Sequence, residues 1–97
     1  SFTMQKAEII DILKSKKSMY HLKNFILFGS FARETNTIDS DIDIAYIEDV
    51  GTKLNFNSYL KLENELENIF KTKIDLINYK KFNPLIKLHS QNEFIYV

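Results

Sequence analysis

The stretch Phe25-Ile26-Leu27-Phe28-Gly29-Ser30, followed by Asp41-Ile42-Asp43-Ile44, decides the fold of this 97-residue chain. Four consecutive apolar residues that end at a glycine are typical of a strand buried on both faces. In the second segment apolar residues alternate with aspartates, as in a strand that has one buried face. The two segments therefore predict two strands, with a Gly-Ser turn at the end of the first.

Further elements follow on either side of these strands, and apolar periodicity and turn residues give their ranges. Helices are expected over about residues 3–15, 30–34, 55–71 and 84–90, and strands over 25–28, 41–47, 74–79 and 93–97. The segments 35–40 and 48–53 are expected to be a loop and a turn. This order predicts an α/β (α+β) fold in one domain over residues 1–97, with a small mixed sheet of about four strands flanked by helices. We expect the last strand at an edge of the sheet.

Composition narrows the class of protein. Hydrophobic residues make up 44% of the chain, which is enough for a core. Thirteen basic and thirteen acidic residues cancel, so the net charge gives no general attraction to nucleic acid or to an acidic membrane. The chain has no cysteine, which excludes disulfides and thiolate zinc sites, and its apolar runs are too short to span a bilayer. We expect a cytoplasmic protein, and we interpret residues 1–3 as left from cloning ahead of a natural start at Met4.

The aspartates of the second strand are the first candidate site. Alternation places Asp41, Asp43 and Ala45 on one face of the strand, with about 6.6 Å along the strand between the two aspartates. Carboxylates at that spacing can converge on one cation, or on two cations about 3.5–4 Å apart. Magnesium prefers oxygen ligands and is commonly held by one or two carboxylates together with substrate phosphates. The alternative interpretation is the solvated face of a half-exposed strand, although aspartate is disfavoured in strands and two on one face repel each other.

Gly29 and Ser30 suggest where the phosphates of a nucleotide would bind. A glycine after a buried strand lets the backbone approach a ligand closely. If a helix begins at Ser30, its free N–H groups and the serine hydroxyl can donate to an anion. Arg33 lies one turn further on, where it could contact a phosphate or anchor the loop. Taken alone, the Gly-Ser pair also fits an ordinary tight turn.

Asp75 is the third acidic candidate, because it stands in the apolar strand segment Lys73-Ile74-Asp75-Leu76-Ile77. An acid in such a strand costs free energy unless it is hydrogen-bonded or paired with a cation. If this strand lies beside the one that carries Asp43, Asp75 could ligate the metal or take a proton from an attacking hydroxyl. Spacing alone leaves this role open.

These motifs resemble a known superfamily. The chain carries a pattern that is similar to the signature of DNA polymerase β-type nucleotidyltransferases. This pattern consists of Gly29-Ser30-Phe31-Ala32-Arg33 and of Asp41-Ile42-Asp43-Ile44, with ten residues between Ser30 and Asp41. More closely, the chain resembles the minimal nucleotidyltransferase (MNT) antitoxins, which act on toxins with a HEPN domain. The segment around Asp75 resembles that family's third acidic strand, and residues 92–96 its closing strand. The resemblance covers essentially the whole chain.

The resemblance implies a role for each matching residue. Gly29 and Ser30 would bind the triphosphate, with Arg33 and Ser40 nearby. The carboxylates Asp41, Asp43 and Asp75 would be catalytic and would hold two Mg²⁺ ions. The implied reaction moves AMP from ATP to a hydroxyl, here a tyrosine of a HEPN-type toxin, so that the chain acts as an antitoxin through protein adenylylation. The implied partners are ATP and the toxin. Independently of the resemblance, the apolar residues of the last strand, 93–97, would favour a partner at the sheet edge, which fits a homodimer or a hetero-oligomer as well as ordinary packing.

Two positions depart from the family pattern. Glu34 stands where many relatives have glycine after the arginine, and it puts an acid next to the expected phosphate loop. Asn92 stands where many have glycine before the last strand, and asparagine tolerates left-handed backbone conformations. Glu34 is the departure that bears on nucleotide affinity.

Two other functions compete with the active transferase. One is a catalytically weak or inactive antitoxin that inhibits its partner by forming a complex. The other is a small-molecule nucleotidyltransferase of the antibiotic-modifying kind, whose relatives usually add a helical domain that this chain has no room for. Retention of Asp41, Asp43 and Asp75 favours the active protein adenylyltransferase.

Overall fold

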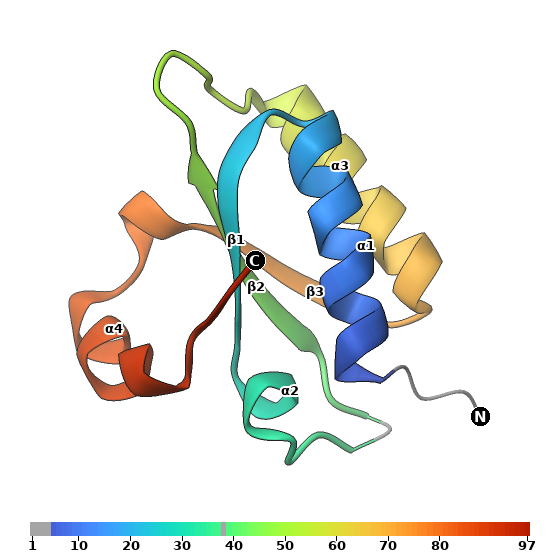
Figure 1. Cartoon of the computed structure of the whole chain (residues 1–97), viewed down its shortest axis with the longest axis vertical. Coiled ribbons are helices and arrows are strands. Elements are labelled where there is room, and N and C mark those ends of the chain that lie inside the picture. Colours follow the sequence, from blue (N-terminus) through green and yellow to red (C-terminus); the bar gives the residue numbers. More distant parts are fainter. Residues whose placement is uncertain (1–4, 38) are drawn as a thin grey trace.

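A computed structural model of the chain describes residues 5–37 and 39–97, and Figure 1 shows its path. The helices are α1 (Lys6–Met19), α2 (Ser30–Arg33), α3 (Phe56–Phe70) and α4 (Pro84–Ser90), with 3₁₀ turns η1 (Tyr79–Lys81) and η2 (Gln91–Glu93). The strands are β1 (Leu22–Phe28), β2 (Ile42–Glu48), β3 (Ile74–Asn78) and β4 (Ile95–Tyr96). The expected class, a four-stranded mixed sheet flanked by helices, is confirmed.

The sheet has the strand order β3-β2-β1-β4. β1 pairs antiparallel with both β2 and β4, whereas β2 and β3 run parallel. Parallel neighbours need a crossover connection, and α3 supplies it. β4 lies at one edge, as expected, and β3 at the other. The two strands that carry aspartates, β2 and β3, are therefore direct neighbours.

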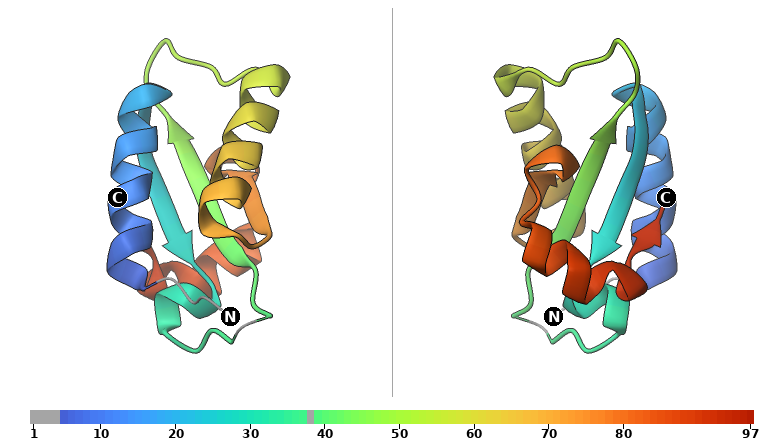
Figure 2. Two further views of the ribbon diagram at one scale, coloured as in Figure 1. Left: turned by 90° about the vertical axis from the view of Figure 1, so that its right-hand side faces the viewer. Right: turned by 90° about the vertical axis from the view of Figure 1, so that its left-hand side faces the viewer.

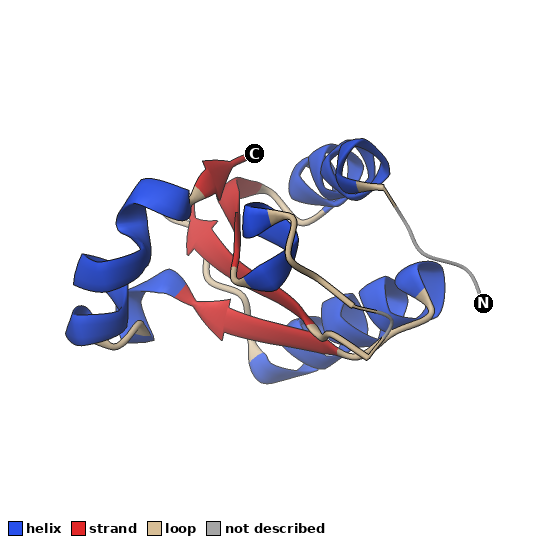
Figure 3. Cartoon of the chain, turned by 90° about the horizontal axis from the view of Figure 1, so that it is seen from below, coloured by secondary structure: helices blue, strands red, loops and turns tan. Residues whose placement is uncertain are grey.

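Helices cover the two faces of the sheet unequally (Figures 1 and 2). α1 and α3 lie side by side on one face, where Ile9, Leu13, Leu62 and Leu66 pack on the apolar side chains of β1 and β2. The segment that contains α4 crosses the other face, seen from below in Figure 3. Phe82 of this segment joins Ile26, Phe28 and Ala45 of the sheet in a smaller cluster of buried residues. β1 is buried from both sides over residues 25–28, as its unbroken apolar run predicted.

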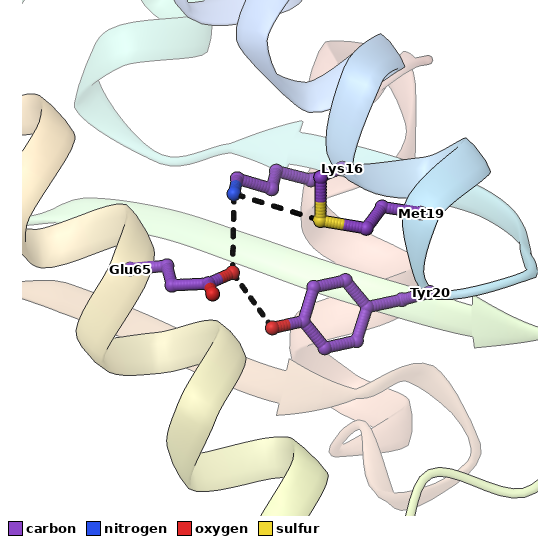
Figure 4. Close-up of polar contacts among 4 residues, drawn as sticks. All are labelled: Lys16, Met19, Tyr20 and Glu65. Atoms are coloured by element: carbon purple, nitrogen blue, oxygen red, sulfur yellow. Dashed lines mark hydrogen bonds and ion pairs between the residues drawn. The ribbon is translucent and has the colours of Figure 1, made fainter.

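A polar contact joins α1 to α3 beside the larger core (Figure 4). The Glu65 carboxylate accepts a hydrogen bond of 2.7 Å from the Tyr20 hydroxyl and pairs with Lys16 Nζ at 3.1 Å. The Tyr20 hydrogen bond is the main cause of a lowered pKa at Glu65, and Lys16 adds to it. This charge-assisted bond fixes the spacing of two helices that otherwise touch through aliphatic side chains.

Several predicted boundaries differ from the structure. α1 continues to Met19 rather than ending near residue 15, because the lysines there are good helix formers and favour the helix C-terminus. The part of this prediction at residues 3 and 4 lies outside the described residues. β1 begins three residues earlier than expected, at Leu22, and its pairing with β2 shifts register between Leu22 and Asn24. β4 is limited to Ile95–Tyr96, because residues 91–93 form a 3₁₀ turn.

Candidate active site

Gly29 ends β1 in a conformation that suits only glycine. Its φ of 74° and ψ of −154° lie in a region that side chains rarely allow. A Cβ on Gly29 would also collide with Asp43 Oδ2. Phe28 and Asp43 are partners in the antiparallel β1–β2 ladder, so the carboxylate lies directly over the Gly29 backbone. The predicted glycine turn and the predicted aspartate strand thus meet at one point.

The segment after Gly29 is a single helical turn. α2 has four residues, and the Arg33 N–H donates to the Gly29 carbonyl at 3.1 Å. The Thr35 N–H returns to the Ser30 carbonyl at 2.9 Å and closes the loop. The predicted helix at residues 30–34 is therefore present over Ser30–Arg33. It is too short to contribute much dipole, so any attraction for phosphate here depends on individual donors and on Arg33.

Asp43 and Asp75 are brought together by the parallel pairing of their strands. They are direct partners in the β2–β3 register, and both belong to the sheet face that carries Ala45 and Ile77. The pKa of Asp43 is raised to about 6, chiefly by desolvation and then by the neighbouring charges of Asp75 and Asp41, whereas Arg33 opposes the shift. Asp41 lies just before β2 and is exposed. Three carboxylates therefore place excess negative charge at the end of the sheet beside Gly29.

This donor set suits a hard divalent cation. Carboxylate oxygens are the ligands that Mg²⁺ takes, and a cation between them would offset the repulsion that raises the pKa of Asp43. Within residues 5–37 and 39–97, however, no three Asp, Glu or His side chains lie close enough together to hold one ion. The pair Asp43–Asp75 is assembled by the fold, while the complete three-carboxylate metal site stays a prediction.

Arg33 is held by a residue that no sequence motif singles out. Its Nη1 donates to Glu93 Oε2 at 3.0 Å, and this ion pair links α2 to η2, sixty positions further along the chain. Because Arg33 also lowers the pKa of Asp43, its charge acts on the carboxylate cluster. Glu93 carries no periodic signal either, so only the folded chain shows that it orients the arginine.

Ser40 has a local partner in the loop before β2. Its Oγ accepts a hydrogen bond of 2.8 Å from the Thr37 N–H, and its carbonyl lies 3.5 Å from Thr72 Oγ1. These contacts shape the loop that leads to Asp41. The nucleotide contact of Ser40 stays a prediction, as do those of Gly29, Ser30 and Arg33.

The structure explains one of the two departures from the family pattern, Glu34, and places the other, Asn92, in regular backbone. Glu34 adopts the left-handed conformation, with φ of 61°, which explains why glycine is common at this position. Its exposed carboxylate pairs with Lys6 of α1 at 3.8 Å. Asn92 lies in the 3₁₀ turn η2 and is not among the residues with positive φ, so its tolerance for the left-handed region is not used.

Comparison with known proteins decides the family. Residues 7–96 match the family model described as "Polymerase beta, Nucleotidyltransferase". The chain belongs to this nucleotidyltransferase family. It is 40% identical over 96 residues to a Methanocaldococcus jannaschii protein named "Putative protein adenylyltransferase", with 94% of this chain and 96% of the relative covered.

Solved structures show the same fold. A minimal nucleotidyltransferase superposes with a TM-score of 0.74 at 20% identity, and the match covers 98% of both chains. A toxin-antitoxin crystal structure with AMP-PNP gives 0.69 at 21% identity, covering 96% of this chain and 72% of the other. A complex of the tri-AMPylated HEPN toxin of Shewanella oneidensis with an MNT antitoxin gives 0.62 at 20% identity, covering 94% and 66%. The structural neighbours of this nucleotidyltransferase therefore include MNT antitoxins.

Proposed function

We propose that this nucleotidyltransferase moves the adenylyl group of ATP to a tyrosine hydroxyl of a HEPN-type toxin, and so acts as its antitoxin. The observation that carries the proposal is the placement of Asp43 beside Asp75 at the glycine turn. Relatives named as protein adenylyltransferases and a neighbour in complex with a modified HEPN toxin support the acceptor class. The neighbour crystallised with AMP-PNP supports an adenine nucleotide as the donor.

In the proposed reaction, the acceptor oxygen attacks the α-phosphorus of ATP while the bond to the pyrophosphate oxygen breaks. A phosphodiester forms on the acceptor and pyrophosphate leaves. The hydroxyl proton passes to a carboxylate, and we assign this role to Asp75, an exposed residue of the edge strand β3. Ser30 and the Gly29 backbone would position the triphosphate, and Arg33 would offset its charge. Asp41, Asp43 and Asp75 would hold Mg²⁺, which supplies charge neutralisation at the phosphates.

The chain is expected to work in the cytoplasm, where ATP, Mg²⁺ and a toxin partner would meet. Within the described residues, no helix is long and apolar enough to cross a lipid bilayer. The exposed Glu34 carboxylate lies 3.8 Å from Lys6 Nζ, and this pairing supports nucleotide binding beside it by offsetting part of its charge. An inactive antitoxin that works by binding alone is kept as the competing function. Among the described residues, no three Asp, Glu or His side chains lie close enough together to hold one metal ion.

The test pairs this chain with a HEPN-domain protein from the organism that encodes it. The two proteins are incubated with ATP and Mg²⁺, and the HEPN protein is then separated and examined by intact mass and peptide mass spectrometry. The proposal expects the mass of a tyrosine peptide of the HEPN protein to increase by whole adenylyl groups. The ribonuclease activity of the HEPN protein should then stay lost even after this chain has been removed. An unmodified HEPN protein that recovers full activity once the complex is dissociated would favour the binding antitoxin.

A further inference from the structure

Helix α4 exposes its large apolar side chains to solvent, whereas two of its polar residues are half-buried. Leu85, Ile86 and Leu88 are 65%, 47% and 63% exposed, whereas Lys87 and Ser90 are half-buried. None of the seven residues of α4, all of which the structure describes, is buried. A helix on a sheet ordinarily turns its apolar stripe toward the core. Here the three aliphatic side chains, which we call the α4 face, point away from the protein's own core.

Residues on either side of α4 hold it in place instead. Phe82 before the helix and Phe94 after it pack edge-on against Phe28, with ring centroids 5.0 and 6.0 Å away. Lys87 Nζ lies 4.4 Å from the centre of the Tyr79 ring. These contacts anchor the segment, while the α4 face itself stays exposed. Leu85 and Leu88 stand three positions apart and are therefore neighbours on one side of the helix, and exposed apolar side chains that gather in this way are typical of an interaction site.

The α4 face stands on the same side of the sheet as the carboxylate pair. Ala45 and Ile77 pack in the cluster under the α4 segment, and Asp43 and Asp75 precede them by two residues on the same strands. Residues two apart on a strand share a face. The α4 segment lies across this face of the sheet (Figures 2 and 3). A macromolecule bound to α4 would therefore lie on the side of the sheet that carries Asp43 and Asp75.

Charge distinguishes between possible occupants. From Tyr79 to Asn92 the chain has Lys80, Lys81 and Lys87 and no acidic residue, and the next acid, Glu93, is paired with Arg33. A second copy that met this surface through its own α4 would set lysine against lysine. A partner with an apolar ridge edged by Asp and Glu would complement it.

We propose that the α4 face docks the protein that receives the nucleotide, and that this protein presents an apolar helix or ridge with an acidic rim. The inference rests on the proposed function, because it assumes a protein acceptor. It adds to that function the surface that brings the acceptor hydroxyl to the carboxylates.

The test compares the double variant Leu85→Ser, Leu88→Ser with a matched control, Phe56→Ser. Phe56 is 71% exposed at the start of α3, a helix of the opposite sheet face. The parent and variant proteins are titrated with the same HEPN-domain protein and, separately, with Mg·ATP. The double variant is expected to bind the HEPN protein at least tenfold more weakly and to raise the KM for it, with ATP affinity and helix content unchanged. The control is expected to match the parent protein.

Other outcomes would overturn the docking surface. The proposal fails if the parent protein does not bind the HEPN protein, or if the double variant binds it as tightly as the parent. It fails as well if the parent is a dimer that the double variant converts to monomer, because α4 would then bind a second copy. Loss of binding to anionic lipid vesicles in the double variant alone would instead assign the α4 face to a membrane. The chemistry fails separately. If HEPN binding depends on the α4 face but no adenylyl group is transferred, the docking surface stands and the proposed function is contradicted. If the parent and the double variant transfer adenylyl groups at equal rates, the proposed function stands and the docking surface is contradicted.

Discussion

Gly29 and Asp43 are in close contact, and this contact defines the position of the candidate site. The glycine supplies a backbone conformation that other residues resist, and the space that its missing side chain leaves is filled by the Asp43 carboxylate. Asp43 is thereby held between the β1 turn and Asp75, partly out of water and close to like charges. Such an arrangement costs stability and is typical of sites that bind a charged ligand.

Replacing this glycine tests the close approach. Gly29→Ala should lower the free energy of unfolding by at least about 2 kcal/mol, because a strained backbone adds to a collision with Asp43. Gly51→Ala is the matched control, since Gly51 also has a positive φ, of 80°, but a Cβ at that position would meet nothing within 4 Å. Urea unfolding measures both. Equal losses in the two variants would show that Asp43 does not crowd Gly29.

The raised pKa of Asp43 predicts a stability change with a definite sign. In the folded chain this carboxyl holds its proton up to about pH 6, against an ordinary value of 3.8. Its contribution to stability is therefore complete below about pH 3.8 and is lost as the pH rises through 6. In EDTA at pH 7.5, Asp43→Asn should be more stable than the parent by about 1 kcal/mol after allowance for solvent screening. Thermal unfolding across pH measures this, with exposed Asp11→Asn as the control, and a less stable Asp43→Asn protein at pH 7.5 would refute it.

At the scale of elements, the Lys16–Glu65–Tyr20 contact predicts the opposite pH dependence. The pKa of Glu65 is lowered by the Tyr20 hydrogen bond and by Lys16. The ionised carboxylate therefore contributes to the free energy of unfolding above its ordinary pKa of 4.5, and this contribution is lost as the pH falls through the lowered pKa of the folded chain. Glu65→Gln should cost about 1 kcal/mol at pH 7 and nothing measurable in acid. Glu63→Gln on the same helix, whose only described partner is Tyr59 at 3.5 Å, serves as the control. A difference that persists unchanged in acid would mean that packing, not charge, is lost.

Elements with explicit end signals were predictable from the sequence, and others were not. α4 spans residues 84–90 as expected, because Asn83 caps Leu85 N–H at 2.9 Å and proline begins the helix. α1 has no glycine or proline at its end, so its extension to Met19 was not predicted. Lys23 obscures the early part of β1, because it interrupts the apolar run between Leu22 and Phe25.

The candidate site shows the same division. Alternation predicted that Asp43 shares a face with Ala45, and the apolar run around Asp75 predicted the strand that carries it. The register that sets Asp43 beside Asp75 depends on the parallel pairing of β2 with β3, which no local pattern encodes. Glu93 as the partner of Arg33 could not be predicted, because it depends on contact across sixty residues.

At the scale of the whole molecule, the two proposed functions, nucleotide transfer and partner binding, share one sheet face. The larger core lies under α1 and α3, while the α4 side carries a smaller core cluster, the carboxylates and the exposed leucines of α4. Docking of a partner, as proposed above, would explain why α4 turns its apolar side chains outward.

The most direct test of the central claim is the rate of adenylyl transfer from α-labelled ATP to the HEPN-domain protein, at saturating Mg²⁺. We expect Asp43→Asn and Asp75→Asn each to lower kcat by roughly a hundredfold or more, with binding of the HEPN protein retained. Asp49→Asn, in the turn after β2, should transfer label at the parent rate. Label transferred equally by the Asp43, Asp75 and parent proteins would contradict a nucleotidyltransferase site at the end of β1.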